Sequence, residues 1–360
     1  MSFVNQGSQP AAPSPLLSGI RRPKDTSRGF TPWSWRLFFL VFLAAFYAIE
    51  LLWIGPVDGI NDDWGMYSTL SGAYLGYPDA RVLFFLYPLS RLLSGLYTLC
   101  SFIPWYGLFM HGVQIACLYA VYIRSMHLWQ RHNSQDPFWK PALTTVCILF
   151  FIVNLNVISE AQYTTVAGLA AAAALFCFAT TKSAGPVSAF LKGNLPTLFF
   201  AWISFSMRQN ILYLMLPIAG MLWLAKWLIA YRTGCEKIPA KLFIFAAVLL
   251  AGMGILYGLN AVAYSGQEWS DFRRINHYRE RVGDFYTWPE YEECAEALTD
   301  LGITEEAYNY RRSGAPHIGY DMSVEDWKQM HDIARECYLA RTNFSDRLKN
   351  IVKGGLTVFL

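Results

Sequence analysis

The apolar residues of this chain gather in seven runs between residues 36 and 264, most of them close to the length of a membrane-spanning helix and one of them, residues 195–207, shorter. A helix that crosses the hydrocarbon core of a bilayer needs about 20 predominantly apolar residues. The runs cover residues 36–57, 106–123, 142–158, 164–181, 195–207, 211–229 and 241–264. This pattern predicts an all-α protein whose residues 36–264 form a polytopic transmembrane bundle of about seven helices.

An eighth apolar run, residues 82–103, either crosses the bilayer or lies along its surface, because Arg81 precedes it and Pro88 and Arg91 interrupt it. Lys and Arg in short loops stay on the cytoplasmic side, so the basic residues decide between the two arrangements. If the run does not cross, thirteen basic residues lie in cytoplasmic segments and only Arg81, Arg91 and Arg208 in short outer ones. We therefore expect a cytoplasmic N-terminus and one long outer loop, residues 58–105, with a surface-lying or re-entrant helical half.

The ends of the chain are polar and are expected outside the bundle. Residues 1–35 are rich in Ser, Pro and Gly and lack a signal-peptide core, so they predict a disordered cytoplasmic tail. Residues 265–353 carry 12 basic and 17 acidic residues and predict a small extracytoplasmic helical domain. Residues 354–360 turn apolar again, which is typical of the start of a further membrane helix.

Helix signals in the polar C-terminal segment are local and specific. Pro289 is expected in a first helical turn, and Gly302 is expected to end that helix. Thr304 precedes two glutamates, and Ser323 precedes Asp326 by three residues, so both are expected to cap further helices. The segment should therefore contain at least three short helices.

Composition agrees with a membrane protein, since 54% of the residues are hydrophobic and only 15% are charged. An ordinary soluble domain of this length is more polar. The seven cysteines show no Cys-x-x-Cys or Cys/His spacing, so neither a zinc site nor a disulfide framework is indicated. We expect a multi-pass protein of the cell (inner or plasma) membrane, with the lipid bilayer as a partner and no nucleic-acid partner.

Residues 58–79 concentrate carboxylates at one membrane boundary, among them the adjacent pair Asp62 and Asp63. Adjacent carboxylates can act as general base toward an acceptor hydroxyl, or can hold a divalent cation that neutralises a phosphate leaving group. The structural alternative is a helix N-cap and turn, because Asn and Asp are favoured there. Asp62 and Asp63 are therefore the candidate catalytic residues, and a divalent metal ion is the candidate cofactor at the same pair.

This loop resembles the first loop of the GT-C class of integral membrane glycosyltransferases, over roughly residues 36–124. The resemblance rests on Asp62-Asp63, on the small residues from Ser71-Gly72 to Gly76-x-Pro78, and on the apolar residues 89–97 before the next helix. In GT-C enzymes a loop acid is the catalytic base, so the resemblance implies that role for Asp62 or Asp63. It leaves the choice between the two open.

A second resemblance is to a group of uncharacterised bacterial polytopic membrane proteins. It is carried by residues 105–109, by residues 162–165 and by part of the polar segment, residues 284–303. This second likeness implies no chemistry.

Ionisable residues at membrane depth are costly and usually face a cavity or a partner. Arg208 lies between two apolar runs, Glu160 follows another, and Glu50 ends the first. By the charge-based orientation all three lie toward the outer side. Arg208 is a candidate for binding a lipid-linked phosphate, which a guanidinium grips bidentately. A structurally paired or snorkelling arginine is the alternative, and for both glutamates the structural interpretation is the stronger one.

Arg81 and Arg91 are further candidates for binding a diphosphate near the acidic loop. Cations at a membrane surface also pair with lipid headgroups, so a structural role stays open for both. With Glu160 and Arg208 they complete the predicted substrate-binding set.

The function predicted from the sequence is transfer of a sugar from a polyprenyl-phosphate donor to a saccharide or glycoconjugate acceptor of the cell envelope, on the outer face. Asp62 or Asp63 would deprotonate the acceptor, and the phosphate would leave against Arg208, Arg81 or a metal ion. The alternatives are a transporter or flippase for lipid-linked saccharides and a non-catalytic assembly partner. Transporters show internal repeats and broken helices, which this sequence does not show, and this favours the enzyme.

Overall fold

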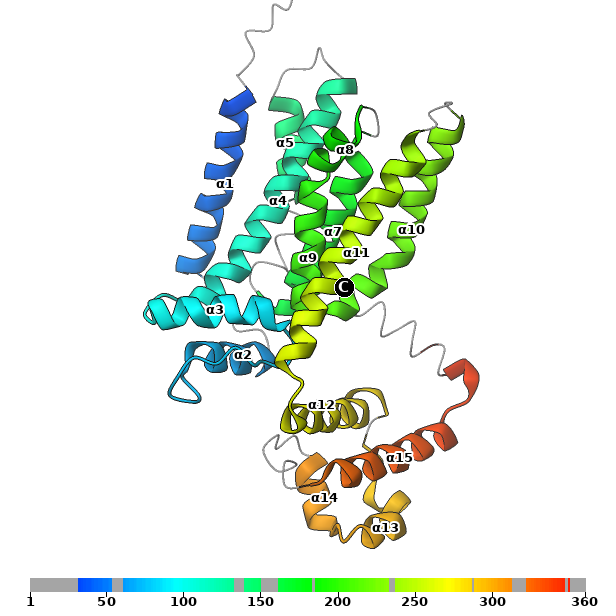
Figure 1. Ribbon diagram of the computed structural model, residues 1–360. Helices are drawn as coiled ribbons and strands as arrows, with labels where there is room; N and C mark the ends of the chain where they lie inside the picture. The colour runs from blue at the N-terminus through cyan, green and yellow to red at the C-terminus, as the bar shows by residue number, and fades with distance from the viewer. Residues whose placement is uncertain are drawn as a thin grey trace, which may run out of the picture. The chain divides into compact units, whose positions relative to one another are not determined.

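The computed structural model is helical throughout the part of the chain that it describes (Figure 1). The described residues are 32–53, 61–132, 139–149, 161–182, 185–232, 237–286, 288–312, 322–346 and 349. Some predictions made from the sequence concern residues outside these ranges, among them residues 1–31, Glu160 and residues 354–360. The prediction of an all-α protein is confirmed for the described residues.

The chain divides into two compact units, whose boundary falls inside a helix. Unit 1 comprises Met1–Phe85 and Leu89–Leu250, and unit 2 comprises Leu86–Pro88 and Ala251–Leu360. The change from apolar to polar composition at residue 265 therefore does not coincide with the boundary in space, because the last long helix continues from one unit into the other.

Unit 1 contains the apolar helices. They are α1 (Pro32–Trp53), α2 (Asn61–Ser71), α3 (Tyr87–Leu99), α4 (Trp105–His132), α5 (Trp139–Leu149), α7 (Tyr163–Thr180), α8 (Val187–Gly193), α9 (Leu195–Met207), α10 (Gln209–Arg232) and α11 (Lys237–Ala263), of which α3 and α11 extend into unit 2.

Among the residues that the structure describes, four helices are long and apolar enough to cross a membrane. The candidate spans are Trp105–Trp129, Tyr163–Thr180, Gln209–Arg232 and Pro239–Ala263. Two shorter apolar helices, Arg36–Ile49 and Leu195–Met207, correspond to two further predicted runs, and the predicted run 142–158 lies partly outside the described residues. These helices suggest a protein associated with the lipid bilayer, as the hydropathy pattern predicted.

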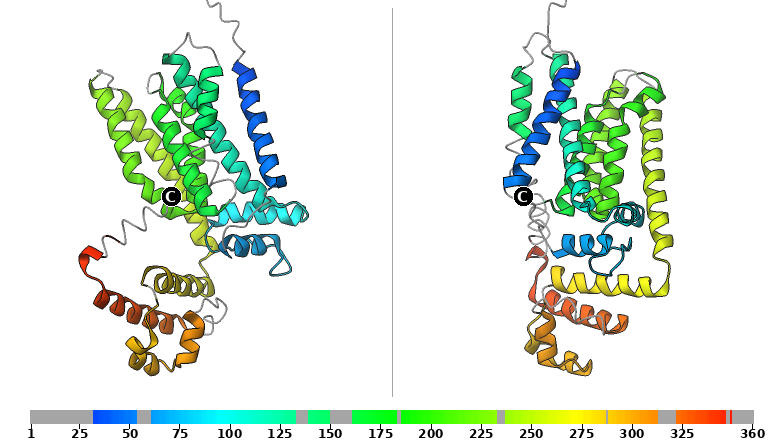
Figure 2. Two further views of the ribbon diagram at one scale, coloured as in Figure 1. Left: turned by 180° about the vertical axis from the view of Figure 1, so that it is seen from behind. Right: turned by 90° about the vertical axis from the view of Figure 1, so that its left-hand side faces the viewer.

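Helix α7 is the centre of unit 1, where it packs against α4, α9 and α10 (Figures 1 and 2). Its middle is rich in small residues: Ala167–Ala174 consists of alanine and glycine apart from Leu169, and most of the alanine side chains are buried. Small residues let neighbouring backbones approach closely, which is how helices associate when lipid removes the hydrophobic drive between them. Helix α1 packs on α4, with the rings of Phe39 and Tyr122 stacked at 3.6 Å.

Helix α3 bears on the question of whether residues 82–103 cross a bilayer. It has 13 residues, so its length is about 20 Å, which is less than the roughly 30 Å of a hydrocarbon core. One face is buried, including Leu89, Leu93 and Tyr97, while Leu92 and Leu99 are exposed. Helix α3 is thus a short amphipathic helix, and the surface-lying or re-entrant position of residues 82–103 stays a prediction.

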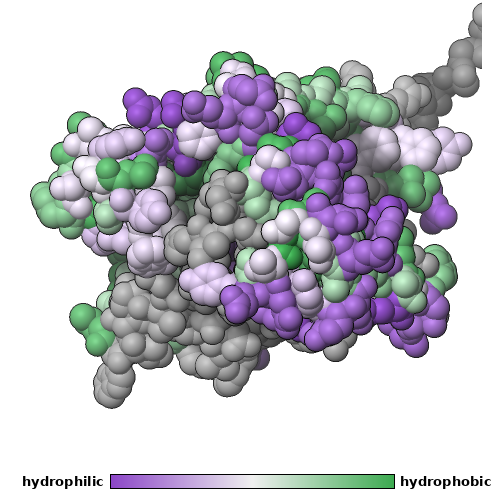
Figure 3. All heavy atoms as spheres, turned by 90° about the horizontal axis from the view of Figure 1, so that it is seen from below, coloured by the Kyte–Doolittle hydropathy of each residue, from purple (hydrophilic) through white to green (hydrophobic). Residues whose placement is uncertain are grey.

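Unit 2 is a small helical domain with its own core. Its elements are α12 (Gln267–Glu280), the π-helical turn η3 (Arg281–Phe285), α13 (Tyr291–Asp300), α14 (Glu305–Arg312) and α15 (Val324–Arg341). The core gathers Val282, Leu298, Tyr308 and Trp327 among other buried side chains. Seen from below, the helices of this unit present mainly hydrophilic side chains (Figure 3). Residues 86–88 belong to it because the Tyr87 N–H donates to Asn260 Oδ1 of α11 at 2.9 Å.

Most of the helix signals read from the sequence of unit 2 are confirmed. Ser323 caps α15, and its hydroxyl accepts from the Asp326 N–H while Asp326 accepts from the Ser323 N–H. Thr304 Oγ1 accepts from the Ala307 N–H at the start of α14. Gly302 follows α13 with φ +69°, a conformation that suits glycine. The prediction for Pro289 was early by two residues, since α13 begins at Tyr291.

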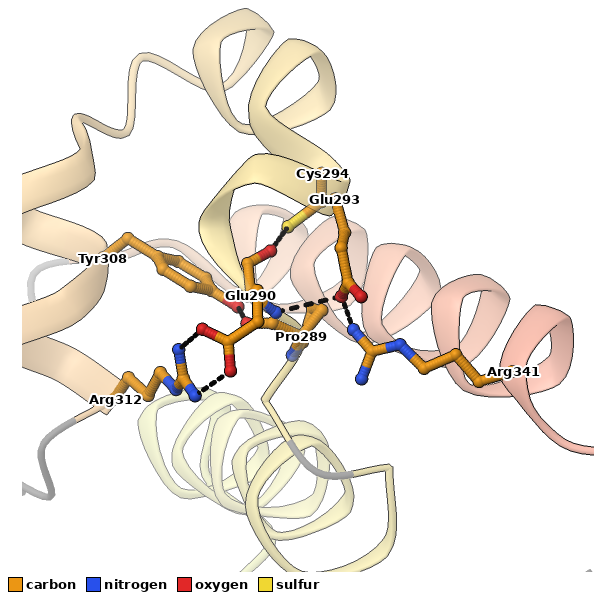
Figure 4. Close-up of polar contacts among 7 residues, drawn as sticks. All are labelled: Pro289, Glu290, Glu293, Cys294, Tyr308, Arg312 and Arg341. Carbon is orange, nitrogen blue, oxygen red and sulfur yellow. Dashed lines mark hydrogen bonds and ion pairs between the residues drawn. The ribbon is translucent and has the colours of Figure 1, made fainter.

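A set of ion pairs ties the start of α13 to two other helices of unit 2 (Figure 4). Glu290 accepts two hydrogen bonds from the Arg312 guanidinium at the end of α14. Glu293 accepts from the Glu290 N–H at 3.0 Å and pairs with Arg341 at the end of α15. Next to these ion pairs, the Tyr308 hydroxyl donates to the Pro289 carbonyl at 2.7 Å. Arg312 holds the pKa of Glu290 below its ordinary value.

Candidate functional site

Asp63 is a buried carboxylate on which three helices of unit 1 converge. It lies in the first turn of α2, where a negative charge is favoured by the helix dipole, and its residue is only 1% exposed. Its Oδ1 accepts a hydrogen bond from the Tyr106 hydroxyl of α4 at 2.5 Å and one from the Tyr163 N–H of α7 at 3.1 Å. Hydrogen bonds to an ionised acceptor are stronger than neutral ones, so Asp63 fixes the position of α2.

The bond from Tyr163 has a local cause in the start of α7. The first N–H groups of a helix have no partner within the helix, and Gln162, the N-cap of α7, makes no side-chain cap. Asp63 supplies an acceptor from another helix instead. This is the capping role that the sequence analysis offered as the structural alternative, although Asp63 caps α7 rather than its own helix.

Arg208 reaches the same tyrosine from the other side. It lies at the junction of α9 and α10, and its Nη1 donates to the Tyr163 hydroxyl and, at 2.9 Å, to Thr164 Oγ1. Its guanidinium lies 5.1 Å from the centroid of the Tyr163 ring and 5.5 Å from that of Phe84. Tyr163 thus joins the loop acid Asp63, through its backbone, to the membrane-level cation Arg208, through its ring and hydroxyl.

Aromatic rings enclose this junction. Phe84 stacks on Tyr163 with centroids 4.9 Å apart, and Phe85 stacks on Tyr106 at 5.8 Å and meets Tyr163 edge-on at 6.4 Å. A cation against aromatic faces is stabilised by the ring quadrupole, most strongly where water is excluded. The rings therefore hold the Arg208 guanidinium without neutralising its charge.

The charge of Arg208 is not paired with a carboxylate among the described residues, where its side-chain contacts are the hydroxyls of Tyr163 and Thr164 and two rings. A guanidinium has five N–H donors, and only Nη1 is used in these bonds. The half-buried Arg208 can therefore bind an anion by donating its remaining N–H groups to it.

Asp62 precedes the buried acid and has an exposed side chain. Both acids lie in the first turn of α2, so the exposed Asp62 is next to the buried Asp63 at the same site. The structure thus brings together three of the residues that the sequence singled out. It gives the two adjacent acids different surroundings, one enclosed by hydrogen bonds and one facing outward.

The other predicted site residues lie elsewhere or outside the described chain. Arg81 and Arg91 both have exposed side chains, and the Arg81 N–H donates to Asp79 Oδ1 at 2.9 Å in the turn after α2. Glu160 falls in the gap before Ala161 and is not described. Across the described residues, no group of three or more His, Cys, Asp or Glu side chains is arranged to hold a metal ion.

Sequence reasoning missed the aromatic residues of the site. Tyr106 and Tyr163 each begin or nearly begin a helix, where a tyrosine reads as an ordinary interfacial residue. Their roles come from contacts to Asp63 across 43 and 100 residues of chain. Phe84 and Phe85 lie inside an apolar run and carry no polar signal. The signal that could have indicated the site is the presence of tyrosines at the starts of two apolar helices in a chain that also has the acidic loop.

Comparison of the chain with protein-family models, with curated proteins and with solved structures finds no match.

Proposed function

We propose that the protein is a membrane glycosyltransferase that moves a sugar from a polyprenyl-phosphate donor to a saccharide or glycoconjugate acceptor of the cell envelope. The observation that carries the proposal is the junction at Tyr163, which holds an acidic loop helix and an arginine whose contacts among the described residues are uncharged, at one site. Sugar transfer from a lipid phosphate needs both functions, a base for the acceptor and a cation for the leaving group.

Arg208 is the group that binds the phosphate. It is half-buried, its described contacts are uncharged, and its guanidinium presents unused donors. A guanidinium binds phosphate oxygens bidentately, and a partly dehydrated site strengthens that interaction. Because the negative charge on the lipid phosphate grows as the glycosidic bond breaks, Arg208 stabilises the transition state more than the bound donor.

Asp62 is the base of the proposed reaction, and Asp63 is the residue that positions it. Asp63 Oδ1 already accepts two hydrogen bonds that fix α2 to α4 and α7, whereas the side chain of Asp62 faces outward. Asp62 takes the proton of the acceptor hydroxyl while the hydroxyl oxygen attacks the anomeric carbon. The bond between that carbon and the phosphate oxygen breaks, and the polyprenyl phosphate leaves against Arg208. Asp62 then releases its proton to water.

The proposal includes an orientation. The distribution of basic residues favours a cytoplasmic N-terminus, which puts residues 58–105 and residues 265–353 on the outer side of the cell membrane. The donor then enters from the outer leaflet. The short amphipathic α3 and the exposed aromatic residues around it suit a surface where a lipid-linked sugar approaches.

The experiment is a turnover assay with the full chain in lipid nanodiscs. A panel of polyprenyl phosphates carrying a radiolabelled hexose or pentose is supplied with envelope oligosaccharides, and the label is followed from the lipid to the aqueous fraction. We expect release by the wild-type chain, its loss in Arg208→Gln, and its retention in Arg232→Gln, which removes an exposed arginine at the far end of α10.

The same preparation separates the enzyme from a flippase. In sealed vesicles a flippase moves the intact lipid-linked sugar between leaflets, so the label becomes accessible to an impermeant oxidant but stays on the lipid. That result contradicts sugar transfer.

A further inference from the structure

Three cations from three helices of unit 1 converge on backbone carbonyls at the end of α7 that lies away from Asp63. Arg124 Nη2 of α4 donates to the Gly193 carbonyl at 2.5 Å, and Lys226 Nζ of α10 donates to the Thr181 carbonyl at 2.8 Å. Lys241 Nζ of α11 donates to the Gly185 carbonyl. All three acceptors belong to the connection between α7 and α9. We call Arg124, Lys226 and Lys241 the basic cluster.

Arg124 and Lys226 approach the same residue, Thr181. Its carbonyl accepts from Lys226, and its hydroxyl donates to the Cys177 carbonyl at 2.7 Å and to the Gly193 carbonyl at 3.2 Å, where Arg124 also donates. A side chain at Gly193 would lie 3.1 Å from the Thr181 methyl group, so the connection is closely packed. The two cations are therefore held near each other by a rigid turn.

These contacts satisfy donors without neutralising charge. Cations near a helix C-terminus are favoured by the helix dipole, which explains why they point at these carbonyls. Yet no described carboxylate forms an ion pair with Arg124 or Lys226, and from residue 80 to 267 the sequence has twelve Lys and Arg against three Asp and Glu. Lysine has three N–H donors and arginine five, so Lys226 and Arg124 have more donors than the bonds described above use.

The basic cluster lies where a lipid headgroup would be expected, near the end of a candidate membrane span and beside exposed apolar side chains. Lys226 lies six residues, or about 9 Å, before the end of α10, which is within reach of the polar edge of a bilayer. Apolar side chains are exposed beside the cluster on α10 and α11, including Leu228, Ile229 and Phe243. Such side chains suit acyl chains rather than water, so the occupant that fits both features is amphipathic.

We propose that the basic cluster binds the phosphate group of an anionic phospholipid whose acyl chains lie along α10 and α11. Exposed Lys182 and Lys192, in the same connection, add positive charge around the site. The site is separate from the one at Asp63, because the 18 residues of α7 between them span about 27 Å. It does not rest on the proposed sugar transfer.

The test is thermal unfolding of the delipidated full chain in detergent, with phosphatidylglycerol, phosphatidylcholine or inorganic phosphate added in turn. Lys226→Met and Arg124→Gln remove cluster charges, Lys226→Arg keeps the charge, and Arg232→Gln removes an exposed charge from the end of the same helix. Because each cation near the membrane surface favours binding of an anionic lipid, we expect phosphatidylglycerol to raise the Tm by roughly 2–4 °C.

The proposal predicts that phosphatidylglycerol raises the Tm of the wild type, Lys226→Arg and Arg232→Gln, and that Lys226→Met and Arg124→Gln lose at least half of the rise. Equal rises with phosphatidylcholine, or an undiminished rise in Lys226→Met, would overturn it. A rise of the same size with inorganic phosphate would assign the site to a soluble anion and overturn the lipid. The three additives are compared first on the wild type, so this comparison can overturn the proposal even if a variant fails to fold.

Discussion

Asp63 Oδ1 accepts a hydrogen bond from the backbone N–H of Tyr163, one hundred residues further along the chain, at 3.1 Å. Through this bond the acidic loop helix α2 caps the central helix α7, and the Tyr163 side chain carries the connection on to Arg208. The position of the exposed acid Asp62 is therefore set by its buried neighbour. The predictions below follow from that arrangement and from the ion pairs of unit 2.

Removing the acceptor at Asp63 should destabilise unit 1. Asp63→Ala removes the acceptor of the Tyr106 hydroxyl and of the Tyr163 N–H, and loss of an acceptor costs about 1–3 kcal/mol for a buried donor. Asp63→Asn keeps an acceptor oxygen and should cost less. Thermal unfolding of the full chain measures both variants.

Tyr106→Phe provides the matched control for that pair. Since Tyr106 donates directly to Asp63, the effects of Tyr106→Phe and Asp63→Ala should not add, and a double-mutant cycle should give a coupling free energy of about 0.5–3 kcal/mol. Strict additivity of the two effects would show that the bond does not hold α2 in place.

Arg208 should control affinity for the lipid phosphate. Hydrogen bonds to charged groups contribute about 1.5–3 kcal/mol, so Arg208→Gln should raise the Kd for polyprenyl phosphate roughly 10- to 100-fold. Arg208→Lys keeps the charge but loses the planar guanidinium and its contact with the Phe84 ring. Its Kd should therefore lie between those of the wild type and Arg208→Gln. Equilibrium binding of radiolabelled polyprenyl phosphate measures all three. An unchanged Kd in Arg208→Gln would remove Arg208 from the site.

The turn after α2 should require glycine at position 72. Gly72 has φ +83°, and a Cβ there would lie 2.6 Å from the Tyr77 carbonyl carbon and 2.7 Å from Pro78 N. Gly76 has φ +79° but open space around it, so Gly76→Ala adds backbone strain without the clash. We expect Gly72→Ala to lower the free energy of unfolding by more than Gly76→Ala, which should cost about 1 kcal/mol. Equal losses would argue against the close approach to Tyr77 and Pro78.

Unit 2 should lose stability in acid through Glu290. Arg312 lowers the pKa of Glu290 below its ordinary value of 4.5, so the pair stabilises the fold fully above pH 4.5. That contribution is lost as the pH falls through the lowered pKa, when the carboxylate is protonated. The Tm difference between wild type and Glu290→Gln should therefore be larger at pH 7 than at pH 3. Glu305→Gln, in the first turn of α14, is the control for loss of an acidic residue in the same unit. A constant difference across this range would mean that the pair does not stabilise unit 2.

The sequence predicted those parts of the fold and site that depend on local pattern. Apolar length predicted the helices, and Ser323 and Gly302 predicted a helix start and a helix end from chemistry within a few residues. Asp62, Asp63 and Arg208 were found because charge is rare in apolar sequence. Their division of roles was not predictable, since burial of Asp63 depends on Tyr106 and Tyr163, which become its neighbours only in the folded bundle.

The same limit applies to the charged residues of unit 2. Glu290 precedes a helix and reads as an ordinary solvated acid, but it meets Arg312 from 22 residues later in the chain. Long-range pairs of this kind leave no periodic signal in a single sequence. For Arg81 and Arg91 the binding role indicated by their position in a candidate loop stays a prediction, and both side chains are exposed.

The measurement that tests the central claim most directly is the rate of sugar release from a polyprenyl-phosphate donor by Asp62→Asn. A general base contributes a factor of about 100 to 10,000, so the variant should lose that much activity while its Tm stays at the wild-type value. Asp79→Asn, which keeps the acceptor for the Arg81 N–H, should retain the wild-type rate. Release by Asp62→Asn at the wild-type rate would contradict sugar transfer at this site.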